Sequence, residues 1–130
     1  MPKVSVTAYK STWPQFFQDE ARGLQQALQE QCEAIHHIGS TAVPGLAAKP
    51  IIDIVAVVPS LIKAIEPIKS TGLIFRGENI IPLHLYFKKE YADYSVNLHV
   101  YEPDNTSIEL HLCFVIICVK HLLSWPNIHS

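Results

Sequence analysis

Residues 36–55 constrain the fold of this chain more than any other stretch, because they change from one kind of local structure to another within a short span. They read as a short strand, a Gly-Ser turn with one or two helical turns, and then a buried strand. Gly39 permits a tight turn and a close approach of a ligand to the backbone. Ser40 and Thr41 can cap the start of a helix, where free N–H groups favour an anion. The turn therefore has the composition of a phosphate cradle.

Asp53 is the single carboxylate in an otherwise apolar run, residues 51–58. The run is rich in β-branched residues and bounded by Pro50 and Pro59, which predicts a strand. Its apolar residues occupy both faces, which favours a place at the centre of a sheet. A carboxylate there is costly unless it is paired, hydrogen-bonded or bound to a cation. A hairpin-like return would bring Asp53 to the Gly-Ser turn, and this predicts a nucleotide and metal site.

The bulk composition is that of an ordinary single domain covering residues 1–130. The net charge is -2 and no basic stripe is visible, which argues against a dedicated nucleic-acid binder. No apolar run is long enough to span a bilayer, and the first residues do not form a signal peptide. The three cysteines show no metal spacing and suit reduced thiols in the cytoplasm. We therefore expect a cytoplasmic protein without a membrane or nucleic-acid partner.

The remaining segments predict further helices and strands around this centre. The first helix begins at Trp13-Pro14 with Ser11 or Thr12 as its cap, and it carries one apolar stripe. Helices are expected at residues 13–31, 41–48 (brief and interrupted), 60–70 and 107–123. Strands are expected at residues 34–38, 51–58, 73–76, 83–89 and 95–101. A turn is expected at residues 77–79.

Residues 83–89 and 95–101 both alternate between apolar and polar side chains, which predicts an antiparallel hairpin with one polar face. If that face meets the Gly-Ser turn, then five polar side chains line one cleft. They are His84, Tyr86, Lys88, Asn97 and His99.

A Gly-Ser turn followed by a strand with an acid is the layout of the nucleotidyltransferase superfold. Nucleotidyl transfer needs a cradle for the triphosphate, a divalent metal and carboxylates that hold the metal. Active members carry Asp-x-Asp or Asp-x-Glu, which places both acids on one face of the strand. Here Val55 stands where the second acid would be, and the matching positions of the neighbouring strand hold Asn97 and His99. One carboxylate with an amide and an imidazole makes a poor Mg²⁺ site.

Each of these residues also has an ordinary structural interpretation. The Gly39-Ser40-Thr41 segment can be a plain strand-to-helix turn, and Asp53 can be a buried acid that caps a short helix or pairs with Lys49. Lys49-Pro50 can be a surface turn. Single histidines and lysines on a polar strand face are usually solvated.

The sequence His-Ile-Gly-Ser-Thr-Ala-Val-Pro-Gly-Leu-Ala-Ala-Lys-Pro-Ile-Ile-Asp-Ile at residues 37–54 resembles the signature of the GrpB family. Trp13-Pro14-x-x-Phe17 with Glu20 supports the resemblance. So does Asn97-Leu98-His99-Val100, which is similar to the family's His-Leu-His-Val. The resemblance covers roughly residues 8–114. It implies a cytoplasmic α+β domain, a nucleotidyltransferase-like mixed β-sheet flanked by helices. Some relatives are fused to a dephospho-coenzyme-A kinase, which points to nucleotide metabolism.

The end of the chain departs from the family pattern. After residue 114 the family continues Arg-Asp-Tyr-Leu-Arg, whereas this chain reads Val-Ile-Ile-Cys-Val. Codons for this run, read one base out of register, can spell the family sequence. The hypothesis is that residues 115–130 are a frameshifted, atypical tail, and resequencing of the gene tests it. An apolar tail of this kind predicts self-association.

Two functions therefore follow as expectations. In the first, the chain is a metal-dependent nucleotidyltransferase acting on an unknown acceptor, with Asp53 as the catalytic residue and Asp53 and His99 holding Mg²⁺ or Mn²⁺. In the second, it is an inactive binding or regulatory module for a nucleotide or phosphorylated small molecule. The ligand-binding residues expected in both cases are Gly39, Ser40, Thr41, Lys49, His84, Lys88 and Asn97.

Overall fold

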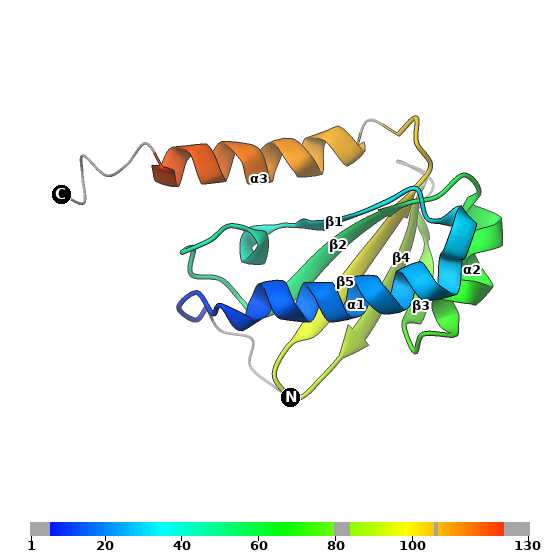
Figure 1. The fold of residues 1–130 in the computed structure, drawn as a ribbon, viewed down its shortest axis with the longest axis horizontal. Coiled ribbons are helices and arrows are strands. Elements are labelled where there is room, and N and C mark those ends of the chain that lie inside the picture. Colours follow the sequence, from blue (N-terminus) through cyan, green and yellow to red (C-terminus); the bar gives the residue numbers. More distant parts are fainter. Residues whose placement is uncertain (1–5, 80–83, 106, 124–130) are drawn as a thin grey trace.

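The computed structural model describes residues 6–79, 84–105 and 107–123. Within them, five strands form one mixed sheet in the order β1-β2-β5-β4-β3 (Figure 1). The central pair, β2 and β5, is parallel, and the other neighbouring strands are antiparallel. The strands are β1 (Ala34–Ile38), β2 (Ile51–Val57), β3 (Ile74–Asn79), β4 (His84–Glu90) and β5 (Ser95–Tyr101), and the helices are α1 (Thr12–Leu28), α2 (Leu61–Lys69) and α3 (Ser107–Leu123), with short 3-10 helices η1 (Gln29–Gln31) and η2 (Ser40–Ala42).

The helices α1 and α2 pack on one face of the sheet and enclose the main core. The apolar stripe predicted for the first helix is confirmed, because Ala21, Leu24 and Leu28 are buried together with Trp13. Ile52 and other alternate residues of β2 and β5 face these helices. Removing so many large apolar side chains from water is the main source of stability for this half of the molecule.

The helix α3 covers part of the opposite face and lies along β1 (Figure 1). Ile108, Leu112 and Val115 follow at helical spacing and pack against a second, smaller cluster that includes Val55 and Tyr101. The rest of this face carries polar side chains and is not covered by a helix of the described residues. We call that part, which presents Asp53, Asn97, Tyr86, Lys88 and Arg76, the open face.

Several predicted elements are confirmed and two are corrected. The strand at 34–38, the central position of β2, the hairpin of β4 and β5, and the helix at 107–123 all agree with the structure. The predicted brief helix at 41–48 is only the 3-10 turn η2, because Pro44 and Gly45 follow and Ala48 then pairs with Thr7. The predicted turn at 77–79 was wrong, since these residues continue β3 after a register shift.

Helix capping also differs between the two earlier helices. Ser60 caps α2 as expected, because its Oγ accepts a hydrogen bond from the Lys63 N–H. Ser11, in contrast, makes no side-chain capping bond at α1.

Within the residues that the structure describes, no helix is both long and apolar enough to cross a bilayer.

Candidate functional site

Three polar side chains from three adjacent strands are linked on the open face. The parallel register places Asp53 of β2 directly beside Asn97 of β5. Asn97 Nδ2 donates a hydrogen bond to Asp53 Oδ1 at 3.3 Å, and the Tyr86 hydroxyl of β4 donates to Asn97 Oδ1 at 3.0 Å. Alternation along each strand puts all three on the face opposite α1 and α2. The amide of Asn97 is therefore oriented from both sides.

The Gly-Ser turn contacts the Asp53 carboxylate, as the sequence predicts. Gly39 has a φ of +75°, and a Cβ at this position would lie 2.6 Å from Asp53 Oδ2. Any other residue would collide with the carboxylate and would also adopt a strained backbone conformation. Glycine is required here because the backbone approaches a functional group closely.

Burial and hydrogen bonding act on Asp53 in opposite directions. Burial raises the pKa of Asp53 and the hydrogen bond from Asn97 lowers it by a smaller amount, so that the net pKa is about 6. Within the described residues Asp53 forms no ion pair, so the pairing with Lys49 that the sequence left open is not present. The exposed side chain of Lys49 is free to meet a ligand.

The side chain of Thr41 is buried and holds the turn in place. Its hydroxyl donates to the Ile51 carbonyl at 2.9 Å, at the start of β2. His37 Nε2 lies 3.0 Å from the same hydroxyl oxygen and therefore acts as the donor. Burial lowers the pKa of His37 to about 4, and its ring stacks on Phe17. Only the backbone of Thr41 is left to contact a ligand, and the supporting role of His37 is one that sequence reasoning missed.

A cavity of about 340 Å³ opens between the turn and β2. It brings together Ser40, Lys49 and Asp53, three of the residues selected from the sequence. The hydrogen bonds of η2 begin with the Ala42 N–H, which leaves the earlier N–H groups of the turn outside its own hydrogen bonding. We call this cavity the turn pocket. Its walls are completed by Val6, Ala47, Ala48 and Ile51.

The donor set around Asp53 does not fit a Mg²⁺ or Mn²⁺ centre. Such ions take several oxygen ligands, usually including more than one carboxylate. The described residues contain no group of three or more His, Cys, Asp or Glu side chains placed to hold a metal. His99, the expected second ligand, lies opposite Val55 rather than Asp53, and its Nδ1 lies 3.4 Å from His84 Nε2. The side chain that the register places beside Asp53 is instead the amide of Asn97.

The predicted polar cleft consists of two connected groups. Asn97 and Lys88 lie with Asp53 on the open face, whereas His84 and His99 lie near His111 of α3. Tyr86 connects the two groups, because its hydroxyl donates to Asn97 and its ring stacks on His99.

The two histidines beside α3 form a cluster with Tyr101 and with His111 of α3. The His99 and His111 rings stack with centroids 5.6 Å apart, and the Tyr101 hydroxyl lies 3.1 Å from His111 Nε2. Burial, followed by the proximity of His84 and His111, lowers the pKa of His99 to about 4. His111 could not be assigned to this cluster from sequence, because helical periodicity alone does not say where α3 docks. We call these four side chains the histidine cluster.

Comparison with known proteins identifies the family of the chain. The family model described as GrpB protein matches residues 3–121. The chain belongs to the GrpB family. It is 38% identical over 130 residues to the UPF0157 protein YqkA of Bacillus subtilis, in a match that covers 97% of this chain but only 36% of that protein. The chain therefore spans about a third of the length of this relative.

Solved structures support the same family and its fold. A crystal structure of the conserved protein GrpB from Enterococcus faecalis superposes with a TM-score of 0.81 at 36% identity, covering 89% of this chain and 73% of that one. The Cid1 poly(U) polymerase superposes with a TM-score of 0.59 at 8% identity, covering 90% of this chain and 37% of that one. The second likeness concerns the fold alone. This GrpB chain thus has the α+β, nucleotidyltransferase-like fold that the sequence predicted.

Proposed function

We propose that this GrpB chain binds a phosphorylated small molecule of the nucleotide class in the turn pocket, without a divalent metal. The observation that carries the proposal is the close contact between the Gly-Ser turn and Asp53 in a cavity that Lys49 also lines. Among the described residues the Lys49 ammonium forms no ion pair. A phosphate in this pocket would meet the Lys49 ammonium, the Ser40 hydroxyl and the N–H groups of the turn. These are donors suited to phosphate oxygens.

Asp53 is the group in the pocket that opposes an anion when it is ionised. Its raised pKa keeps a larger share of the carboxyl protonated near neutral pH than an exposed aspartate would retain. A protonated carboxyl can donate a hydrogen bond to a phosphate oxygen. Because a carboxyl with a pKa of about 6 is still mostly ionised at pH 7, we expect phosphate binding to draw a proton to Asp53 and to strengthen as the pH falls toward 6.

Metal-dependent nucleotidyl transfer is the alternative function, and the position of Asp53 on β2 beside the turn favours it. That chemistry needs further carboxylates, and Val55 and Asn97 occupy the positions where the fold would offer them. We therefore place the binding module first.

A thermal-shift panel tests the choice between the two. Nucleoside mono- and triphosphates and coenzyme-A precursors are added to the wild type, to Lys49→Gln and to Lys63→Gln, each with EDTA or with Mg²⁺ or Mn²⁺. A ligand that binds only the native state raises the Tm by mass action. We expect a rise that persists in EDTA, shrinks in Lys49→Gln and is unchanged in Lys63→Gln, whose lysine is exposed on α2 across the sheet.

Two results would overturn this proposal. A rise in Tm that requires Mg²⁺ or Mn²⁺ and disappears in Asp53→Asn would favour the transferase. The absence of a rise with every ligand, in a protein shown to be folded by circular dichroism, would leave the turn as a purely structural feature.

A further inference from the structure

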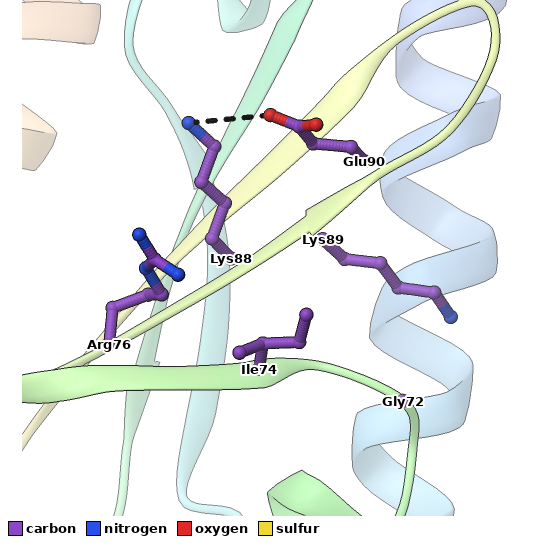
Figure 2. A pocket seen from close by; sticks show the side chains of 6 residues that line it. All are labelled: Gly72, Ile74, Arg76, Lys88, Lys89 and Glu90. Carbon is purple, nitrogen blue, oxygen red and sulfur yellow. Dashed lines mark ion pairs between the residues drawn. The ribbon is translucent and has the colours of Figure 1, made fainter.

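The open face holds a second cavity, of about 580 Å³, at the edge formed by β3 and β4. Figure 2 shows Arg76 and Lys88 extending from these neighbouring strands toward the same side, whereas Lys89 extends toward the other side. We call this cavity the edge pocket. It is lined by Gly72, Ile74, Arg76, Lys88, Lys89 and Glu90.

A β-bulge determines the position of Arg76. Ile74 and Phe75 pair with Lys88 and Phe87, and the register then shifts so that Gly77 pairs with Tyr86. Arg76 is the extra residue of β3 at this shift. Bulges re-aim side chains and occur often beside functional sites. Arg76 is exposed and forms no ion pair within the part of the chain that the structure describes.

The three basic residues of the edge pocket are not equally available. Lys89 Nζ donates to the Thr71 carbonyl at 3.3 Å and lies 4.9 Å from the centre of the Tyr91 ring, so it is already engaged. Lys88 Nζ lies 3.7 Å from Glu90 Oε2 in a partly exposed pair, which is a weak interaction that a ligand can replace. Arg76 and Lys88 thus present two cations against the one carboxylate of Glu90. A guanidinium beside an ammonium is well suited to a phosphate group.

The two pockets lie at opposite ends of one row of side chains. The strand register places Asp53 beside Asn97, Asn97 beside Lys88, and Lys88 beside Ile74. Adjacent strands are roughly 4.8 Å apart, so Asp53 and Lys88 lie about 10 Å apart and β3 lies about 14 Å from β2. Both pockets therefore open on the same face, at a separation that one small molecule can span.

We propose that the edge pocket is a second phosphate subsite, and that the ligand of this chain carries two phosphate groups separated by roughly 10–14 Å. The inference rests on the proposed function for its first phosphate, which occupies the turn pocket. Arg76 and Lys88 bind the second phosphate, and the middle of the ligand crosses Asn97 and Tyr86. The substrate class is thus an extended, doubly phosphorylated nucleotide rather than a nucleoside monophosphate.

Amide NMR with inorganic phosphate as the probe tests the two subsites separately. In the ¹H–¹⁵N spectrum of the wild type we expect one set of shifts around Ser40 and Lys49 and another around Arg76 and Lys88. In Arg76→Gln the second set should be lost and the first retained, while Lys63→Gln should show both. An unperturbed edge pocket in the wild type, or unchanged shifts there in Arg76→Gln, would overturn the second subsite. If the wild type showed shifts around Arg76 and Lys88 but none around Ser40 and Lys49, the proposed function would be overturned and the second subsite would not.

A linear polyphosphate tests whether one ligand spans both pockets. Linked groups that bind two sites together gain affinity through their effective concentration. Long-chain polyphosphate should bind the wild type and Lys63→Gln at least about tenfold more tightly than it binds Arg76→Gln. Equal affinities for Arg76→Gln and Lys63→Gln would show that the two pockets do not act on one molecule.

Discussion

Gly39 is the residue that fixes the distance between the turn and the Asp53 carboxylate. Its positive φ, and the 2.6 Å that would separate an added Cβ from Asp53 Oδ2, leave room for no side chain. The chain offers an internal comparison in Gly23, which lies within α1 with nothing within 4 Å of an added Cβ. The same substitution at these two glycines should therefore have opposite effects.

We expect Gly39→Ala to lower the free energy of unfolding by about 2 kcal/mol or more, because strain and collision add. Gly23→Ala should raise it by about 0.5–1 kcal/mol, because alanine favours a helix interior. Urea unfolding of both variants measures the difference. Equal stability of Gly39→Ala and the wild type would mean that the turn does not lie as close to the Asp53 carboxylate as the structure shows.

The sequence predicted which candidate residues share a face of the sheet better than it predicted their individual contacts. Period-two alternation placed Asp53, Asn97 and Lys88 on one face, and the structure agrees. Alternation could not predict that the Thr41 hydroxyl donates a hydrogen bond to the Ile51 carbonyl, because that bond forms only when η2 packs against β2. The separation of His99 from Asp53 likewise depends on the strand register, which alternation does not determine.

At the scale of elements, α3 shows where sequence prediction ends. Its bounds follow from its apolar composition, but its docking position depends on partners distributed over β1, β2 and β5. The histidine cluster joins it to the sheet, where the rings of His84 and Tyr86 of β4 lie against His99 and the ring of Tyr101 of β5 stacks on His84. Because this contact includes histidine side chains, we expect the packing of α3 on the sheet to become less stable as the pH falls.

We expect acidification from pH 7 to pH 5 to lower the free energy of unfolding through His99 by about 1–2 kcal/mol. The pKa of His99 in the folded protein is about 4, below the ordinary value of 6.5. Between these two pH values His99 is therefore protonated in the unfolded chain and neutral in the native state. Stability is therefore present above pH 6.5 and is lost as the pH falls toward 4. His111 and His37 act in the same direction, whereas Asp53, with its raised pKa, acts in the opposite direction below pH 6.

The variant His99→Gln isolates this contribution, because the other groups remain in both proteins. Urea unfolding at pH 7 and pH 5 should show a smaller loss in His99→Gln than in the wild type, and the protection factors of α3 amides, which are corrected for the intrinsic pH dependence of exchange, should fall more at pH 5 in the wild type than in the variant. An identical loss in the two proteins would place the pH dependence elsewhere.

At the scale of the whole molecule, α3 carries apolar side chains that no described element covers, and two of them, Leu110 and Phe114, lie one helical turn apart on the side away from the sheet. Leu110 is 70% exposed, Phe114 46% and Ile116 52%. Exposed apolar patches of this kind promote association between copies of a protein. The sequence predicted self-association through the tail at residues 115–130, and the exposed Leu110 and Phe114 lie in the part of α3 directly before it, where we propose to test it.

We expect sedimentation equilibrium to show a weight-average mass that rises with concentration in the wild type and less so in Leu110→Glu. Ile62→Glu is the matched control, because Ile62 is 82% exposed on α2, away from α3. A wild type that stays monomeric, or an equal effect of the two substitutions, would contradict association through α3.

The parallel pairing of β2 with β5 has a consequence for how the chain folds. The hairpin of β4 and β5 and the antiparallel pair of β1 and β2 each form from nearby residues, but joining them closes a long loop, since Asp53 and Asn97 are 44 residues apart. Contacts between distant residues form late, because the entropy of loop closure opposes them. The carboxylate and amide of the candidate site therefore meet only when the sheet is complete, and a ligand that needs both would recognise the finished fold and no partly folded intermediate.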